Sequence, residues 1–203
     1  MGRPRTPAGD HELLEDLRAG DEKAFVALVG RHNHALFYVA RAFVQSDAIA
    51  EEVVQDTWMA VVRGLSKFEG RSSIKTWLVS IVVNRARSTG RRESRVLPLS
   101  SSEAAVDPKR FDTNGLWISP PEYFSDDAED RVIAGLLTER IRSALDNLPE
   151  SQRQVVTLRD VEGLDSKDVC RLLEISEVNQ RVLLHRGRSR LRQDLETEFG
   201  RVQ

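Results

Sequence analysis

A proline-rich, acidic segment divides the sequence into two parts. Between residues 96 and 130 the chain carries four prolines, a serine run, and 8 acidic against 2 basic side chains. Prolines interrupt both helices and sheet ladders, and a stretch this polar buries little surface. The segment therefore predicts a flexible acidic linker between two small domains. Its scattered apolar residues indicate that the linker packs on another surface: Phe111, Leu116, Trp117, Ile118, Tyr123 and Phe124.

The sequence on either side of this linker predicts three further segments. We expect a disordered tail over residues 1–10, a first domain over 11–95 and a second domain over 131–203. Residues 1–95 carry a net charge of +3, the linker −6 and residues 131–203 a net charge of +1. Local patches set the field that a polyanion experiences, so the overall net charge of −2 does not exclude nucleic-acid binding.

Both predicted domains have the apolar spacing of helices. Apolar residues recur three and four positions apart, and no convincing two-residue alternation appears. Asp21, and then Ser46 or Asp47, are candidate N-caps in the first domain, and Asp165 is one in the second. The sequence therefore predicts an all-α fold with two small helical domains.

Several functional classes are disfavoured by what the sequence lacks. The single cysteine, Cys170, excludes an intramolecular disulfide and a cysteine-rich metal site. The four histidines show no metal-ligand spacing, and no glycine-rich phosphate loop is present. No apolar run approaches the roughly 20 residues that span a bilayer, and no apolar segment follows the first arginines. We therefore expect a cytoplasmic protein without membrane insertion, and neither an enzyme nor a protein with a metal or cofactor.

Two charged clusters in the first domain each allow two interpretations. The sequence predicts a third long helix in this domain, which starts at Ser72 or Ser73 and ends in a run of arginines. This arginine run is either a solvated helix end or a phosphate-binding ridge. It comprises Arg85, Arg87, Arg91, Arg92 and Arg95. An acidic helix face is either solvated or docks a basic protein surface; it comprises Glu51, Glu52, Gln55 and Asp56.

The second domain ends in a helix-turn-helix pattern, in which a short helix and a turn of about three residues precede a longer basic helix. On the last helix we expect Val182, Leu184, Leu191 and Leu195 to face the core. We expect the polar residues to face outward: Asn179, Gln180, Arg181, His185, Arg186 and Arg188. Asn, Gln and Arg side chains make bidentate contacts with base edges. The alternative is a packing helix with a basic outer face.

From about Leu13 to Leu195 the sequence resembles the bacterial extracytoplasmic-function (group four) sigma factors, which consist of the second and fourth sigma domains and a linker. Three stretches carry this resemblance: AFVALVGRHNHALFYVA, EEVVQDTWMAVVRGLSKFEGRSSIKTWLVSIVVNRAR and LDNLPESQRQVVTLRDVEGLDSKDVCRLLEIS. The sequence departs from the family pattern at Glu174, where glycine is usual, and at Leu183, where a basic residue is common.

The resemblance implies a role for each cluster. The residues expected to contact the β′ coiled coil of core RNA polymerase are Glu52, Gln55 and Asp56. Those expected at the −10 element, including the loop that captures a flipped base, are Phe68, Arg71, Ser72, Ser73, Lys75, Trp77, Asn84, Arg85, Arg87, Arg91 and Arg92. Those expected at the −35 element are Ser166, Lys167, Asn179, Gln180, Arg181, His185, Arg186 and Arg188.

The implied partners are core RNA polymerase (the β′ coiled coil and the β flap), promoter DNA and an anti-sigma factor, in a stress or envelope response. Two other functional classes stay open. One is a helix-turn-helix regulator whose N-terminal domain binds a signal or a partner, and the other is a polymerase-binding protein that does not contact DNA. The first leaves the acidic face and the arginine run unexplained, and the outward polar residues of the last helix disfavour the second.

Overall fold

The computed structural model describes residues 8–93 and 140–199. The elements in these ranges are helical and include no strand, which confirms the all-α prediction. They form two compact units, one on each side of the segment 94–139. The predicted linker and residues 1–7 of the predicted tail lie outside the described residues.

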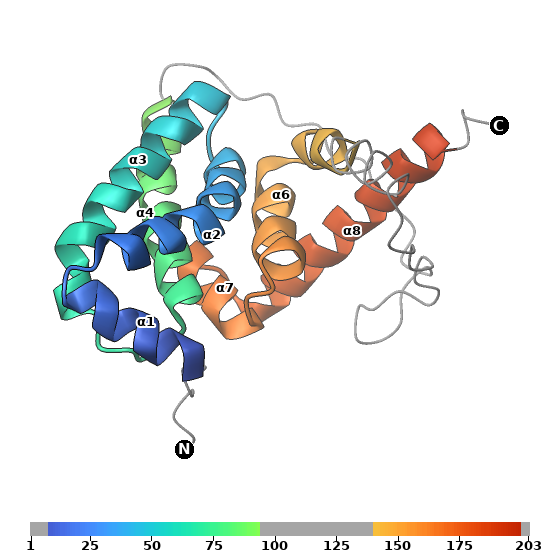
Figure 1. Ribbon diagram of the computed structural model, residues 1–203. Helices are drawn as coiled ribbons and strands as arrows, with labels where there is room; N and C mark the ends of the chain where they lie inside the picture. Colours follow the sequence, from blue (N-terminus) through green and yellow to red (C-terminus); the bar gives the residue numbers. More distant parts are fainter. Residues whose placement is uncertain (1–7, 94–139, 200–203) are drawn as a thin grey trace, which may run out of the picture. The chain divides into compact units, whose positions relative to one another are not determined.

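The first unit consists of long helices joined by short turns (Figure 1). Its elements are α1 (Ala8–Arg18), α2 (Glu22–Arg41), α3 (Asp47–Gly64), the 3-10 helix η1 (Leu65–Lys67) and α4 (Ile74–Glu93). Helix starts follow the side-chain caps. The Asp21 carboxylate accepts from the amides at the start of α2, the Ser46 hydroxyl accepts from Ile49 N, and the Ser73 hydroxyl accepts from Thr76 N.

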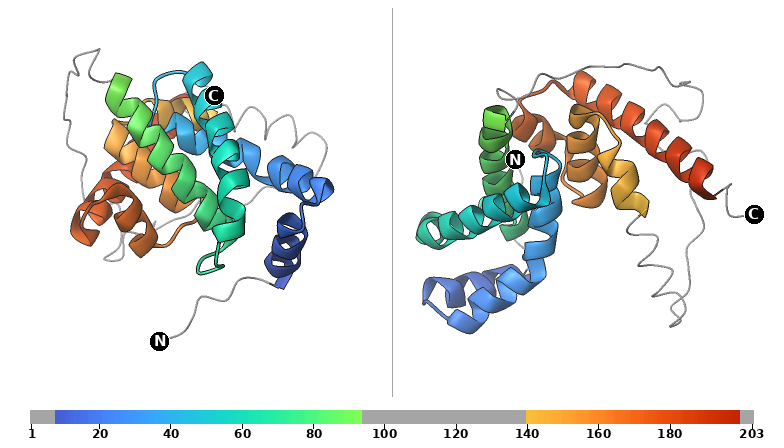
Figure 2. Two further views of the ribbon diagram at one scale, coloured as in Figure 1. Left: turned by 90° about the vertical axis from the view of Figure 1, so that its left-hand side faces the viewer. Right: turned by 90° about the horizontal axis from the view of Figure 1, so that it is seen from above.

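Helices α3 and α4 lie side by side, and both pack against α2 (Figure 2). Fully buried aliphatic side chains from all three helices fill the space between them: Leu28, Leu36, Val39, Val61, Leu78, Val82 and Val83. Gly90 allows the end of α4 to approach the chain that leaves α2, because a Cβ at this position would lie 2.4 Å from the carbonyl oxygen of Phe43. This packing fixes which faces of α3 and α4 remain exposed.

The second unit has a described helical segment over 140–146, followed by shorter elements and one long helix. The elements are α6 (Glu150–Val156), the π-helical η3 (Thr157–Val161), α7 (Ser166–Leu173) and α8 (Glu177–Phe199). The Asp165 carboxylate accepts from Asp168 N and caps α7, as predicted. The Ser176 hydroxyl accepts from Asn179 N in the first turn of α8.

Helix α8 begins beside α7 and packs along α6 (Figure 1). A small apolar core joins these helices; its buried members are Leu148, Val155, Val156 and Leu184. Gly187 makes the crossing close, because a Cβ there would lie 2.6 Å from Val156 Cγ2. The position of α8 is therefore set by its contact with α6.

The turn between α7 and α8 is built on a left-handed residue. Glu174 ends α7 with φ 58° and ψ 42°, and it is the only non-glycine with a positive φ among the described residues. Ile175 N donates to the Cys170 carbonyl, which closes the helix end. The turn therefore has the conformation that glycine normally supplies, with glutamate in its place.

Candidate functional site

The acidic face of α3 is exposed in the first unit. Glu52, Gln55 and Asp56 are all exposed, while Val53, Val54 and Thr57 on the same turns are buried. Thr57 satisfies its hydroxyl within the helix by donating to the Val53 carbonyl at 2.8 Å. The buried side chains anchor α3, so the acidic side chains are held on a rigid surface that a cationic partner can reach.

An ion pair joins this acidic face to α4. Arg85 Nη1 donates to Asp56 Oδ2 at 3.2 Å. The two side chains belong to different predicted surfaces. Asp56 is predicted to contact core polymerase, whereas Arg85 is predicted to contact promoter DNA. Both are partly exposed, so the pair contributes little to stability but fixes where the guanidinium lies.

The same residues line an open groove of about 540 Å³ between α3 and α4. Its lining brings together Glu52 and Asp56 from α3 with Asn84, Arg85 and Ser88 from α4. The structure thus places members of two predicted binding surfaces within one groove, with acidic groups on one wall and polar and basic groups on the other. Nothing in the sequence spacing indicated that they would meet.

The loop before α4 is supported by a buried aromatic residue. The Phe68 side chain is buried and stacks on Trp77, with ring centroids 4.6 Å apart and an interplanar angle of 28°. Arg18 Nη2 donates to the Phe68 carbonyl. Because the Phe68 ring is buried, it is not placed to stack on a base in this structure. It packs instead against the ring of the half-buried Trp77 and supports it.

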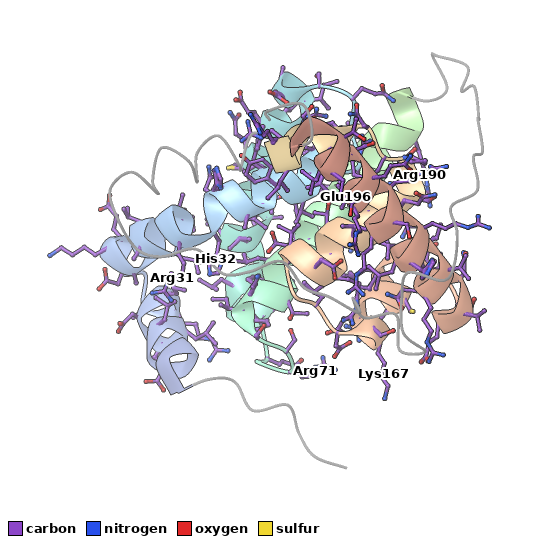
Figure 3. All side chains as sticks on the ribbon, turned by 90° about the vertical axis from the view of Figure 1, so that its right-hand side faces the viewer. Arg31, His32, Arg71, Lys167, Arg190 and Glu196 are labelled. Carbon is purple, nitrogen blue, oxygen red and sulfur yellow. The ribbon has the colours of Figure 1, made fainter. Side chains whose placement is uncertain are left out.

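The polar residues of this loop differ in their environments. Arg71 is exposed on the loop and pairs with Glu69 at 3.0 Å (Figure 3). Ser73 caps α4, and Ser72 and Lys75 are half-buried. The loop therefore offers one clearly exposed cation, and its two serines lie at the helix start.

Along α4, the predicted DNA-binding residues follow one another toward the helix end. Asn84 and Arg91 are exposed, and Arg85 and Arg87 are half-buried. The side chain of Arg92 lies outside the described part of the chain. The exposed amide of Asn84 and the cations that follow it form a polar ridge suited to phosphates and base edges.

In the second unit, α8 is rotated relative to the prediction. Gln180 is only 2% exposed, so the prediction that it faces outward is wrong. Leu183 is partly buried against the apolar core, whereas Val182, expected in the core, is 41% exposed. The Ser166 hydroxyl lies 3.0 Å from Gln180 Oε1 and ties α7 to the inner side of α8. Sequence spacing alone did not distinguish these two rotations.

Arg188 also does not face outward as predicted. Its Nε and Nη2 donate to the two carboxylate oxygens of Asp160, at 2.8 and 2.7 Å, and its side chain is 14% exposed. The hydrogen bonds that Arg188 donates to the Asp160 carboxylate raise the pKa of Arg188; burial opposes this, and the opposite charge of Asp160 adds to it. Arg188 therefore links α8 to η3, and its guanidinium is not positioned to bind a phosphate.

The remaining predicted residues of α7 and α8 are accessible to different degrees. Lys167 extends away from the first turn of α7 (Figure 3). Asn179, Arg181 and Arg186 are exposed on α8, and His185 is half-buried. Arg181 makes a loose ion pair with Glu177, with the nearest nitrogen and oxygen 3.6 Å apart. Sequence reasoning missed Val178, which is 70% exposed on the same helix.

Family comparison matches both units. The Sigma-70 region 2 family covers residues 28–96, and the Sigma-70 region 4 family covers residues 138–191. The ECF RNA polymerase sigma-E factors of Salmonella typhimurium and Escherichia coli K12 are each 30% identical over 185 residues, spanning 88% of this chain and 90% of the relative.

The chain belongs to the extracytoplasmic-function (ECF) sigma factors.

Two solved structures have the same fold as this chain. CnrH in complex with the cytosolic domain of CnrY is 24% identical, with a TM-score of 0.56 over 93% of this chain and 97% of that one. The sigma factor RpoE from Bartonella quintana, in complex with the anti-sigma factor NepR, is 24% identical, with a TM-score of 0.57 over 86% of this chain and 98% of that one. The family matches and the sigma-E relatives confirm the resemblance found in the sequence, and the two solved structures share the fold.

As an ECF sigma factor the chain is a transcription initiation factor. Across 8–93 and 140–199, no helix is both long and apolar enough to cross a bilayer. The same residues contain no group of three or more His, Cys, Asp or Glu side chains that could hold a metal ion.

Proposed function

We propose that this ECF sigma factor works in the cytoplasm, binds core RNA polymerase through the exposed face of α3 and directs it to promoters with −10 and −35 elements. The observation that carries the proposal is the joint match to regions 2 and 4 on a chain that spans 90% of its sigma-E relatives. A helix-turn-helix regulator accounts for the second unit alone. The chain itself catalyses no reaction in this scheme.

Residues 11–95 act as sigma domain two. The exposed Glu52, Gln55 and Asp56 dock a basic polymerase surface, which we assign to the β′ coiled coil. The exposed Asn84 and the arginines that follow it bind the −10 element, and the Trp77 ring, supported by Phe68, borders the strand that is opened. An unstacked base needs an aromatic surface and a polar edge reader, and this part of the unit supplies both.

Residues 131–203 act as sigma domain four, which meets the β flap and the −35 element. Lys167 at the start of α7 binds phosphate, and Asn179, Arg181 and Arg186 at the start of α8 face the major groove. The acidic linker over 96–130 joins the two domains. Since RpoE of Bartonella quintana was solved with an anti-sigma factor, we assign a partner of that kind to this chain as well, in a stress or envelope response.

Reconstitution with core polymerase tests the polymerase assignment. Glu52→Ala with Gln55→Ala is expected to weaken binding to core polymerase without loss of helix, because both side chains are exposed and neither joins the ion pair with Arg85. Asp16→Ala, an exposed acid on α1, is the matched control. Equal affinity of the double variant and the parent would remove α3 as the docking surface.

Run-off transcription on genomic fragments tests the sigma activity itself. The full chain with core polymerase is expected to start transcripts at discrete sites, while the free chain binds duplex DNA weakly because its basic surfaces are short. Both domains engage at high effective concentration only when polymerase holds them. Tight, sequence-specific binding by the chain without polymerase, and no transcript with it, would favour the helix-turn-helix regulator.

A further inference from the structure

The exposed face of α8 is centred on two valines in its first two turns. Val178 is 70% exposed and Val182 is 41% exposed. At 100° per residue they point directly away from the inner face of the helix, where Gln180, Leu184 and Gly187 lie. Among the described residues of α8, they are the large apolar side chains that are exposed.

Cations flank these valines on both sides. Arg181 and Arg186 are exposed and lie on opposite edges of the face that Val178 and Val182 occupy. An apolar centre with basic edges fits a partner that is negatively charged at its rims and has apolar groups at its floor. A DNA major groove has this arrangement, with phosphates on both walls.

The floor of the major groove offers one apolar group, the C5 methyl of thymine. The other base edges are hydrogen-bond donors and acceptors, and a valine held against them would remove water without replacing its hydrogen bonds. Against a thymine methyl, the same valine buries apolar surface.

We propose that Val178 and Val182 read thymine methyl groups in the −35 element. The inference rests on the proposed function, in which α8 enters the major groove. Four residues of α-helix rise about 6 Å, and base pairs are spaced about 3.4 Å apart. The two thymines are therefore about two base-pair steps apart where the helix follows the groove, and Arg181 and Arg186 lie toward the phosphates on either side.

Replacing thymine by uracil provides a sharp test, because the two bases differ only in the C5 methyl. The assay uses the full chain with core polymerase and a −35 element selected from a randomised pool. Each thymine is replaced by uracil in turn, and promoter binding is measured. Burial of one methyl predicts a loss of about fourfold at one or two positions.

The valine variants connect this loss to α8. Val178→Ala and Val182→Ala are each expected to abolish the uracil effect at one position and to leave the other unchanged. Both keep the helix, because the sites are exposed and alanine has the higher helix propensity. Val161→Ala is the matched control, since Val161 is 50% exposed in the same unit but lies in η3. It should retain both uracil effects.

Three results would overturn the proposal. One is specific initiation at a selected promoter with no uracil effect at any −35 position, which leaves the sigma function intact. Another is a uracil effect that persists in both valine variants, which assigns the methyl contact to other residues. The third is the absence of promoter-specific initiation, which overturns the proposed function together with this inference.

Discussion

Replacing Asp160 by alanine is expected to destabilise the second unit by about 2 kcal/mol. The Asp160 carboxylate accepts two hydrogen bonds from Arg188, and the exposed fractions of the two side chains are 31% and 14%. Hydrogen bonds to charged groups contribute about 1.5–3 kcal/mol, and the partial exposure of Asp160 places this pair toward the lower end. The loss is local, because the pair joins η3 to α8.

Amide hydrogen exchange of the full chain measures this loss unit by unit. A decrease of about 2 kcal/mol in the free energy of opening predicts exchange roughly 30-fold faster for amides of α6 and α8. Amides of α2 and α4 in the first unit are the internal reference and should not change. Separate reporting matters because two units need not unfold in one transition.

A second arginine on α8 is the matched control. Arg186 is exposed, and its replacement by alanine should leave exchange in α6 and α8 unchanged. Arg188→Ala should reproduce the effect of Asp160→Ala. Unchanged exchange in Asp160→Ala, or an equal effect in Arg186→Ala, would show that the ion pair does not hold α8 in place.

Four further substitutions have defined outcomes. Glu174→Gly should stabilise the second unit by roughly 0.5–1 kcal/mol and raise its urea midpoint. A left-handed backbone costs a non-glycine residue about 1–2 kcal/mol, and glycine avoids this cost but loses more chain entropy on folding. A lower midpoint would contradict this reasoning. Gly187→Ala should cost about 1–3 kcal/mol and speed exchange in α6, because its Cβ meets Val156; normal exchange would show that the crossing adapts. Phe68→Ala should destabilise the first unit by about 3–5 kcal/mol in urea, whereas the exposed Asn84→Ala should keep stability within about 0.5 kcal/mol and reduce permanganate-detected opening of the −10 element. Normal opening in Asn84→Ala would remove that residue from the mechanism.

The helical content and several helix starts could be predicted because their causes are local. Asp21, Ser46 and Asp165 each lie directly before an amphipathic segment, and each side chain caps the helix that follows. The acidic face of α3 was also predictable, since the residues between its members are apolar and buried. These features depend on neighbours within about one helical turn.

The rotation of α8 could not be predicted, because its causes are distant in sequence. Residues 182–184 are all apolar, so spacing permits more than one buried face. The inner face is fixed by Ser166, which contacts Gln180 from α7, and by the close crossing of α6 at Gly187. The partner of Arg188 lies 28 residues away. The burial of Phe68 could not be predicted either, because this residue lies in a loop, where no helical spacing indicates which side chains are buried.

The ion pair between Asp56 and Arg85 gives the proposed polymerase and promoter contacts a thermodynamic linkage. A polymerase cation that binds Asp56 releases Arg85, and a phosphate that binds Arg85 releases Asp56, so each ligand removes a competitor of the other. Coupling of this kind is reciprocal. A partly exposed pair is worth at most about 1 kcal/mol, which limits the cooperativity to about fivefold. In the free chain, Asp56 and Arg85 thus neutralise each other. The complex with both polymerase and promoter is therefore favoured over the complex with either one alone.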